Sequence, residues 1–127
     1  MLYVHDGQTL FDPADAYGGQ TWGVVPALLA LRAAQAAPPT IVVGLWNTPL
    51  RRQEYGPAAP LARLPAAWRD QVYGGPALSD GYLRFLVDDL KPHIDATYRT
   101  LPGPAHTRVM GSSMGGLISL YALVQHP

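Results

Sequence analysis

The stretch that decides the fold reads Thr107-Arg108-Val109-Met110-Gly111-Ser112-Ser113-Met114-Gly115-Gly116-Leu117-Ile118. Val109 and Met110 end a short apolar run that is typical of a buried strand. Beyond the turn, apolar side chains recur at the spacing of a helix: Leu117, Ile118, Leu120, Tyr121, Leu123 and Val124. Between them lies the pattern Gly-x-Ser-x-Gly, with Ser113 at its centre. We therefore predict a strand at 107–111, a tight turn at 111–115 and a helix at 116–125.

The glycines of this turn have a physical purpose. A sharp bend from a strand into a helix leaves little room two positions on either side of its central residue, and Gly111 and Gly115 carry no side chain. The hydroxyl of Ser113 would then stand exposed above a helix N-terminus, where unpaired N–H groups favour negative charge. The pattern favours a serine nucleophile. The alternative is a Gly-Ser turn that only joins the strand to the helix.

Composition excludes several classes of function. The 127 residues are enough for one domain, and the 9 basic and 9 acidic side chains cancel, so no basic surface predicts a nucleic-acid partner. The chain has no cysteine, which removes thiol chemistry and thiolate metal sites. No apolar run is long enough to span a membrane. We expect no metal and no cofactor. The absence of a leader slightly favours a cytoplasmic location, although we expect that the native N-terminus lies before Met1.

Strands and helices alternate along the rest of the chain. Apolar runs predict strands at 1–5 and 40–46, and helical periodicity predicts helices at 22–36 and 81–98. Pro92 should kink or divide the second helix. The proline-rich interval 47–80 is expected to be a pocket loop. The alternation predicts an α/β fold with a parallel sheet.

Several segments in this order resemble one known family. They are Tyr3-Val4-His5-Asp6-Gly7-Gln8-Thr9-Leu10-Phe11, Val42-Val43-Gly44, Arg51-Arg52-Gln53-Glu54-Tyr55, Asp89-Leu90-Lys91-Pro92, Tyr98-Arg99-Thr100 and the turn at 111–117. The chain resembles the esterase D / enterochelin-esterase-like family of α/β hydrolases. The resemblance implies that the strands at 1–5, 40–46 and 107–111 are the third, fourth and fifth of that fold. Their spatial order would be 4-3-5, a partial α/β-hydrolase fold.

The resemblance also implies the reaction. Ser113 would be the nucleophile of an ester hydrolase that works through an acyl-enzyme on a small-molecule ester. The oxyanion hole would be formed by the backbone N–H of Met114 and by that of Gln8, or of Gly7 instead. An acyltransferase would use the same serine with another acceptor. A third alternative is a non-catalytic remnant, or an interaction module, that kept the turn.

Residues after the strand at 40–46 are candidates for the substrate pocket, because ligands bind beyond the carboxyl ends of parallel strands. We expect Trp46, Asn47 and Tyr55 to contact substrate. The resemblance matches Arg51 and Glu54 to an R-x-x-E-Y element, and we expect these two to form an ion pair in the pocket wall. His5 is expected to be a strand-end histidine beside the oxyanion loop, although half of a metal or acid–base site is the alternative.

A complete catalytic triad of serine, acid and histidine is not expected within these residues. In this fold the acid and then the histidine follow the serine. Every Asp and Glu precedes Ser113, and His126 lies thirteen residues beyond it, roughly 20 Å along a helix. We therefore expect a fragment of a larger hydrolase, truncated before its acid and its histidine and inactive by itself. Such a fragment is expected to self-associate through the open edges of its sheet.

Overall fold

Three short parallel strands form the centre of the fold. The computed structural model describes all residues, 1–127. β1 (Leu2–His5) lies between β2 (Val42–Leu45) and β3 (Arg108–Met110), so the sheet order is β2-β1-β3. Both pairings are parallel. The predicted architecture is confirmed: the chain forms a parallel α/β sheet with its first strand in the middle.

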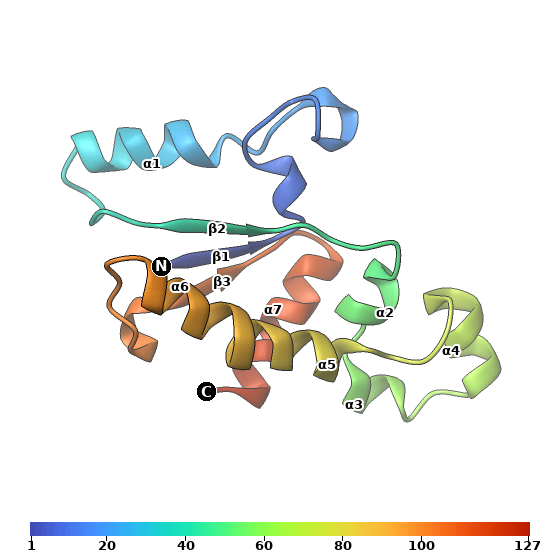
Figure 1. Ribbon diagram of the computed structural model, residues 1–127. Coiled ribbons are helices and arrows are strands. Elements are labelled where there is room, and N and C mark those ends of the chain that lie inside the picture. The colour runs from blue at the N-terminus through green and yellow to red at the C-terminus, as the bar shows by residue number, and fades with distance from the viewer.

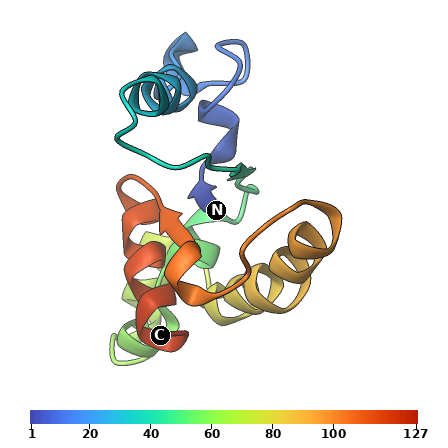
Figure 2. The ribbon, with the colours of Figure 1, turned by 90° about the vertical axis from the view of Figure 1, so that its left-hand side faces the viewer.

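Helices cover the two faces of the sheet unequally (Figure 1). α1 (Val24–Ala33) lies over one face, while α5 (Ser79–Arg84), α6 (Lys91–Thr97) and α7 (Met114–Gln125) lie over the other, as the end-on view of Figure 2 shows. The main core forms on the side of α5–α7. Its buried side chains are Tyr3, Leu45, Tyr55, Leu83, Leu86, Ile94, Ile118, Tyr121 and Ala122.

α1 is shorter and more exposed than its sequence predicts. The helix was expected over 22–36, but Gly23 stands before it with φ 65°, and Gln35 just after it has φ 56°. Both are left-handed conformations that cannot continue an α-helix. None of its residues is buried, and Leu29 is 61% exposed. Much of the apolar side-chain surface of α1 is therefore exposed within residues 1–127.

The interval expected to be a pocket loop folds into three short helices. They are α2 (Arg51–Tyr55), α3 (Ala58–Leu61) and α4 (Ala66–Tyr73). Pro57 and Pro65 stand directly before the last two helices. A proline is tolerated at a helix start, where its missing N–H would have no partner in any case. The prolines thus begin helices here, and the three helices lie beyond the carboxyl ends of the strands (Figure 1).

The helix predicted at 81–98 continues through Pro92 and is not divided there. It runs from α5 through a π-helical segment, η3 (Phe85–Leu90), into α6. The N–H of Lys91 donates to the carbonyl of Leu86, five residues back. A widened turn accommodates the proline ring, which would otherwise meet the carbonyl group four residues before it.

Short helical turns complete the chain. They are η1 (Gly7–Thr9), η2 (Tyr17–Gly19) and η4 (Pro104–His106). Among all the helices, none combines the length and the apolar character needed to cross a bilayer.

Candidate active site

Ser113 stands on a strained turn between β3 and α7. Its backbone has φ 54° and ψ −119°, a conformation that side chains of L-residues rarely adopt. Its side chain is exposed, at the head of a 12-residue helix. Non-glycine residues persist in such conformations only where the surrounding packing enforces them, and they cluster at functional sites.

The two glycines of the turn explain how it is enforced. A Cβ on Gly111 would lie 2.5 Å from the carbonyl carbon of Gly115, so the end of β3 and the start of α7 are in backbone contact. A Cβ on Gly115 would lie 3.3 Å from Oδ2 of Asp6 and 3.3 Å from Cβ of His5. The turn therefore packs on itself and on the end of β1.

At the starts of α7 and η1, the leading backbone N–H groups do not donate to their own helix. The first hydrogen bond of α7 is donated by Gly115, not by Met114. In the turn after β1 the first internal hydrogen bond is donated by Thr9, so the N–H groups of Gly7 and Gln8 precede it. Such leading N–H groups have no partner inside their own helix and suit a developing negative charge.

A buried carboxylate occupies the end of β1. Asp6 is 5% exposed and has a left-handed backbone, φ 58°. Nε and Nη2 of Arg51 donate to its two carboxylate oxygens at 2.6 and 2.7 Å, and Nδ2 of Asn47 donates to Oδ1 at 2.6 Å. Burial acts to raise the pKa of Asp6, but the hydrogen bonds from Arg51 and Asn47 outweigh it and hold the pKa below its ordinary value. The carboxylate is therefore charged and held at three points.

The prediction that Arg51 and Glu54 form an ion pair is wrong. Arg51 pairs with Asp6, and Glu54 accepts a hydrogen bond from the hydroxyl of Thr48 at 2.9 Å. A carboxylate that is almost wholly buried needs a compensating charge more than one with access to water. The guanidinium therefore turns toward the sheet, where it also lies 5.1 Å from the centroid of the Tyr55 ring.

His5 is buried beneath the turn. It has no exposed surface, its Nδ1 is 2.6 Å from the hydroxyl of Tyr82, and its ring packs against Tyr55 and Tyr82. Nε2 has no hydrogen-bond partner. Burial lowers the pKa of His5 to about 4, against the opposing charge of Asp6. The imidazole is therefore neutral at pH 7. His5 is a buried histidine at the end of β1, as the sequence predicts.

The other predicted contacts lie in different settings. Trp46 is 61% exposed beyond β2. Asn47 is half-buried, and its N–H donates to Oε1 of Gln8 at 3.3 Å while its side chain holds Asp6. Tyr55 is fully buried, and its hydroxyl accepts the N–H of Asp6 at 3.2 Å, so no ligand reaches it in this structure. Tyr82 was missed, because no local pattern connects it with a histidine 77 residues away.

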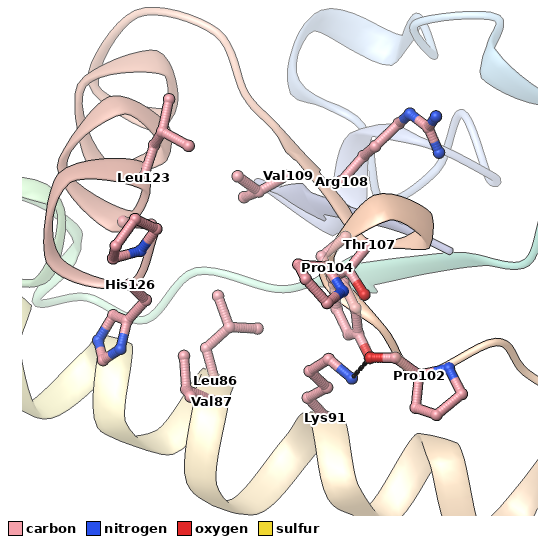
Figure 3. Close-up of a pocket in the computed structure, with 13 residues that line it drawn as sticks. Leu86, Val87, Lys91, Pro102, Pro104, Thr107, Arg108, Val109, Leu123 and His126 are labelled. Carbon is pink, nitrogen blue, oxygen red and sulfur yellow. Dashed lines mark hydrogen bonds between the residues drawn. The ribbon is translucent and has the colours of Figure 1, made fainter.

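Two of the cavities in the structure bear on the predicted residues. One, of about 530 Å³, adjoins α2 and α5 and is lined by Glu54, Ala77, Leu78, Asp80, Gly81, Tyr82, Arg84 and Phe85. The other, of about 310 Å³, lies at the amino end of β3, where Val109, Leu86 and Leu123 form an apolar wall (Figure 3). His126 lines the second cavity, at the opposite end of α7 from Ser113. No group of three or more His, Asp or Glu side chains is arranged to hold a metal ion.

Comparisons with known proteins agree with the fold. A family described as "Putative esterase" matches residues 1–127. "Uncharacterized protein YbbA" of Bacillus subtilis (strain 168) is 27% identical over 126 residues, which are 99% of this chain and 44% of that protein. The chain thus spans less than half the length of this curated relative. No solved structure matches it. On the match over its whole length, together with the β2-β1-β3 sheet, the chain belongs to this esterase family.

Proposed function

We propose that the whole protein is a carboxylic ester hydrolase in which Ser113 is the nucleophile. The exposed hydroxyl on a strained turn at the head of α7 carries this proposal. Ser113 Oγ attacks the ester carbonyl carbon and gives up its proton to a general base. The C–O bond to the alcohol breaks, and the alcohol leaves with that proton. Water then attacks the acyl-enzyme, releases the carboxylic acid and restores the serine.

The oxyanion would be held by backbone N–H groups from two elements. Met114 supplies one, as the residue after the nucleophile, and Gln8 supplies the other, with Gly7 as the alternative. The support is that these N–H groups precede the first hydrogen bonds of α7 and of η1. Removing one such donor in other enzymes typically costs about 10²–10³-fold in kcat.

We propose that the general base and its acid come from outside residues 1–127. His5 adjoins the turn, but it is buried, hydrogen-bonded to Tyr82 and a weak base, since burial lowers its pKa to about 4. His126 is at the far end of α7. A serine without a base is a weak nucleophile, so residues 1–127 alone should hydrolyse esters only at the residual level that an oxyanion hole gives.

The substrate would enter beyond the carboxyl ends of the strands, where ligands of α/β sheets bind. Trp46 is the predicted contact that the solvent reaches most freely, and Glu54 lines the 530 Å³ cavity beside α2. We assign Trp46 and Glu54 to the walls of the substrate pocket. We assign no direct substrate contact to the other three, Asn47, Arg51 and Tyr55. The side chains of Asn47 and Arg51 bind the Asp6 carboxylate, and the hydroxyl of Tyr55 accepts the backbone N–H of Asp6.

The test is hydrolysis of p-nitrophenyl acetate by the whole protein. Ser113→Ala should lose about 10³-fold or more in kcat, and Ser112→Ala, its exposed neighbour, should keep wild-type turnover. Equal activity in Ser113→Ala and in the wild type would overturn the proposal. The same assay on residues 1–127 alone should show no rapid turnover that depends on Ser113. Such turnover would overturn the assignment of the base to residues outside them.

Expressed alone, residues 1–127 should self-associate. β2 and β3 each have one unpaired edge, and apolar side chains of α1 and α7 are exposed, including Leu29 at 61% and Leu123 at 63%. Open strand edges and apolar surfaces favour association. Sedimentation of this chain should show concentration-dependent oligomers, and a monodisperse monomer at high concentration would contradict the proposal.

A further inference from the structure

The carboxylate of Asp6 connects the two elements that meet at the proposed oxyanion hole. Its Oδ2 is 3.3 Å from the position that a Cβ on Gly115 would take, in the first turn of α7. The backbone carbonyl oxygen of Asp6 begins the turn after β1. It accepts hydrogen bonds from the N–H of Thr9 at 3.0 Å and from the hydroxyl of Thr9 at 2.7 Å. A shift of Asp6 would therefore move the Gly7–Gln8 turn relative to the elbow, the tight turn at 111–115 that carries Ser113.

Arg51 alone forms an ion pair with this carboxylate. The contact is two-pronged, Nε to Oδ1 at 2.6 Å and Nη2 to Oδ2 at 2.7 Å, which fixes orientation as well as charge. His5 adjoins Asp6 in the chain, but burial lowers its pKa to about 4, so it brings no positive charge at pH 7. Without Arg51 the Asp6 carboxylate would be buried and negative, with only the Asn47 amide on its oxygens.

We propose that Arg51 is a positioning residue for the esterase reaction: by clamping Asp6, it holds the Gly7–Gln8 turn against the elbow and neutralises a charge beside the oxyanion hole. This inference rests on the proposed function. Arg51 does not touch the substrate. An uncompensated carboxylate would oppose the negative charge that develops on the carbonyl oxygen, and displacement of a catalytic group by about 1 Å can cost about 10²-fold in rate.

The experiment compares three variants of the whole protein with p-nitrophenyl acetate. Arg51→Met removes the clamp, and Asp6→Asn/Arg51→Met removes the clamp and the charge together. Arg52→Met is the matched control, because Arg52 lies on the same helix, is exposed, and donates to the carbonyl of Val72 at 3.2 Å. Thermal unfolding first establishes that each variant is folded at the assay temperature.

The expected results separate positioning from mere stability. Arg51→Met should lower kcat by about 30- to 100-fold with KM changed by less than about threefold, because the loss falls on the transition state. The double variant should regain about tenfold in kcat, since the negative charge is gone. The inhibition constant of phenylboronic acid, whose serine adduct is anionic, should rise in Arg51→Met by a factor similar to the loss in kcat. Arg52→Met should match the wild type in all three quantities.

Several outcomes would overturn the proposal. They are equal kcat in Arg51→Met and Arg52→Met, a loss confined to KM, or a double variant no faster than Arg51→Met. If Arg51→Met does not fold, Arg51→Lys is measured, which keeps the charge but not the two-pronged contact, and wild-type kcat there would refute the clamp. Full activity in Ser113→Ala would instead refute the proposed function, so the two failures are distinguishable.

Discussion

Gly111 and Gly115 are in direct backbone contact: a Cβ on Gly111 would lie 2.5 Å from the carbonyl carbon of Gly115 and 2.6 Å from its oxygen. The contact joins the end of β3 to the first turn of α7, and between them Ser113 is held at φ 54°. A strained residue of this kind costs about 1–3 kcal/mol, which the surrounding packing must offset. The glycine contact therefore stabilises the turn that presents the serine hydroxyl.

Gly111→Ala should destabilise the fold by about 1–3 kcal/mol, because the new methyl group meets backbone atoms that cannot rotate away. Urea unfolding measures the change in free energy. Gly103→Ala is the control, since a Cβ on Gly103 would have no atom within 4 Å. An unfolding midpoint for Gly111→Ala equal to that of the control would contradict the close approach.

Ser113→Gly should be more stable than Ser113→Ala by about 1 kcal/mol, because only glycine adopts φ 54° and ψ −119° without strain. Both variants lack the hydroxyl, so their difference reports the backbone alone. At Ser112, which does not have a positive φ, the order should reverse, with alanine the more stable. Guanidinium unfolding of the four variants gives both comparisons. The same order at both positions would mean that Ser113 is not strained.

The sheet and the turn could be predicted because their signals are local. An apolar run followed by Gly-x-Ser-x-Gly and a helical repeat specifies β3, the elbow and α7 within about twenty residues, and the family resemblance gave the order of the strands. The partner of Arg51 could not be predicted in this way. Glu54 is three residues away in the chain, whereas Asp6 is 45 residues away and becomes the partner only when β1 and α2 meet.

Burial was equally hard to read from the sequence. Tyr55 follows a strand end, as a substrate contact would, but it is enclosed between His5 and Tyr82. The π-helical segment before Pro92 was missed because a proline in a helical repeat predicts a break, and only the geometry of the turn reveals another solution. Such features depend on which distant elements pack together.

Tyr82→Phe should destabilise the protein by about 1–3 kcal/mol, because it removes the hydrogen-bond partner of a buried imidazole. His5 would then have no partner on either ring nitrogen, since Nε2 already lacks one. Tyr98→Phe is the control, as Tyr98 is 53% exposed. Urea unfolding at pH 7 compares the two. Equal losses would show that the 2.6 Å contact between His5 and Tyr82 contributes nothing to stability.

The stability of the fold should fall between pH 6.5 and about pH 4 because of His5. Burial lowers its pKa from 6.5 to about 4, so in this window the unfolded chain binds a proton that the folded chain does not. The stability conferred by the neutral imidazole is complete above pH 6.5, declines as the pH falls, and is exhausted near the folded pKa, a loss of about 3 kcal/mol. Asp6, whose pKa is below its ordinary 3.8, loses its contribution only at lower pH.

Urea unfolding at a series of pH values should show this slope in the wild type and in His93→Gln, where an exposed imidazole is removed, but not in His5→Gln. A slope that persists in His5→Gln would assign the titration to another group.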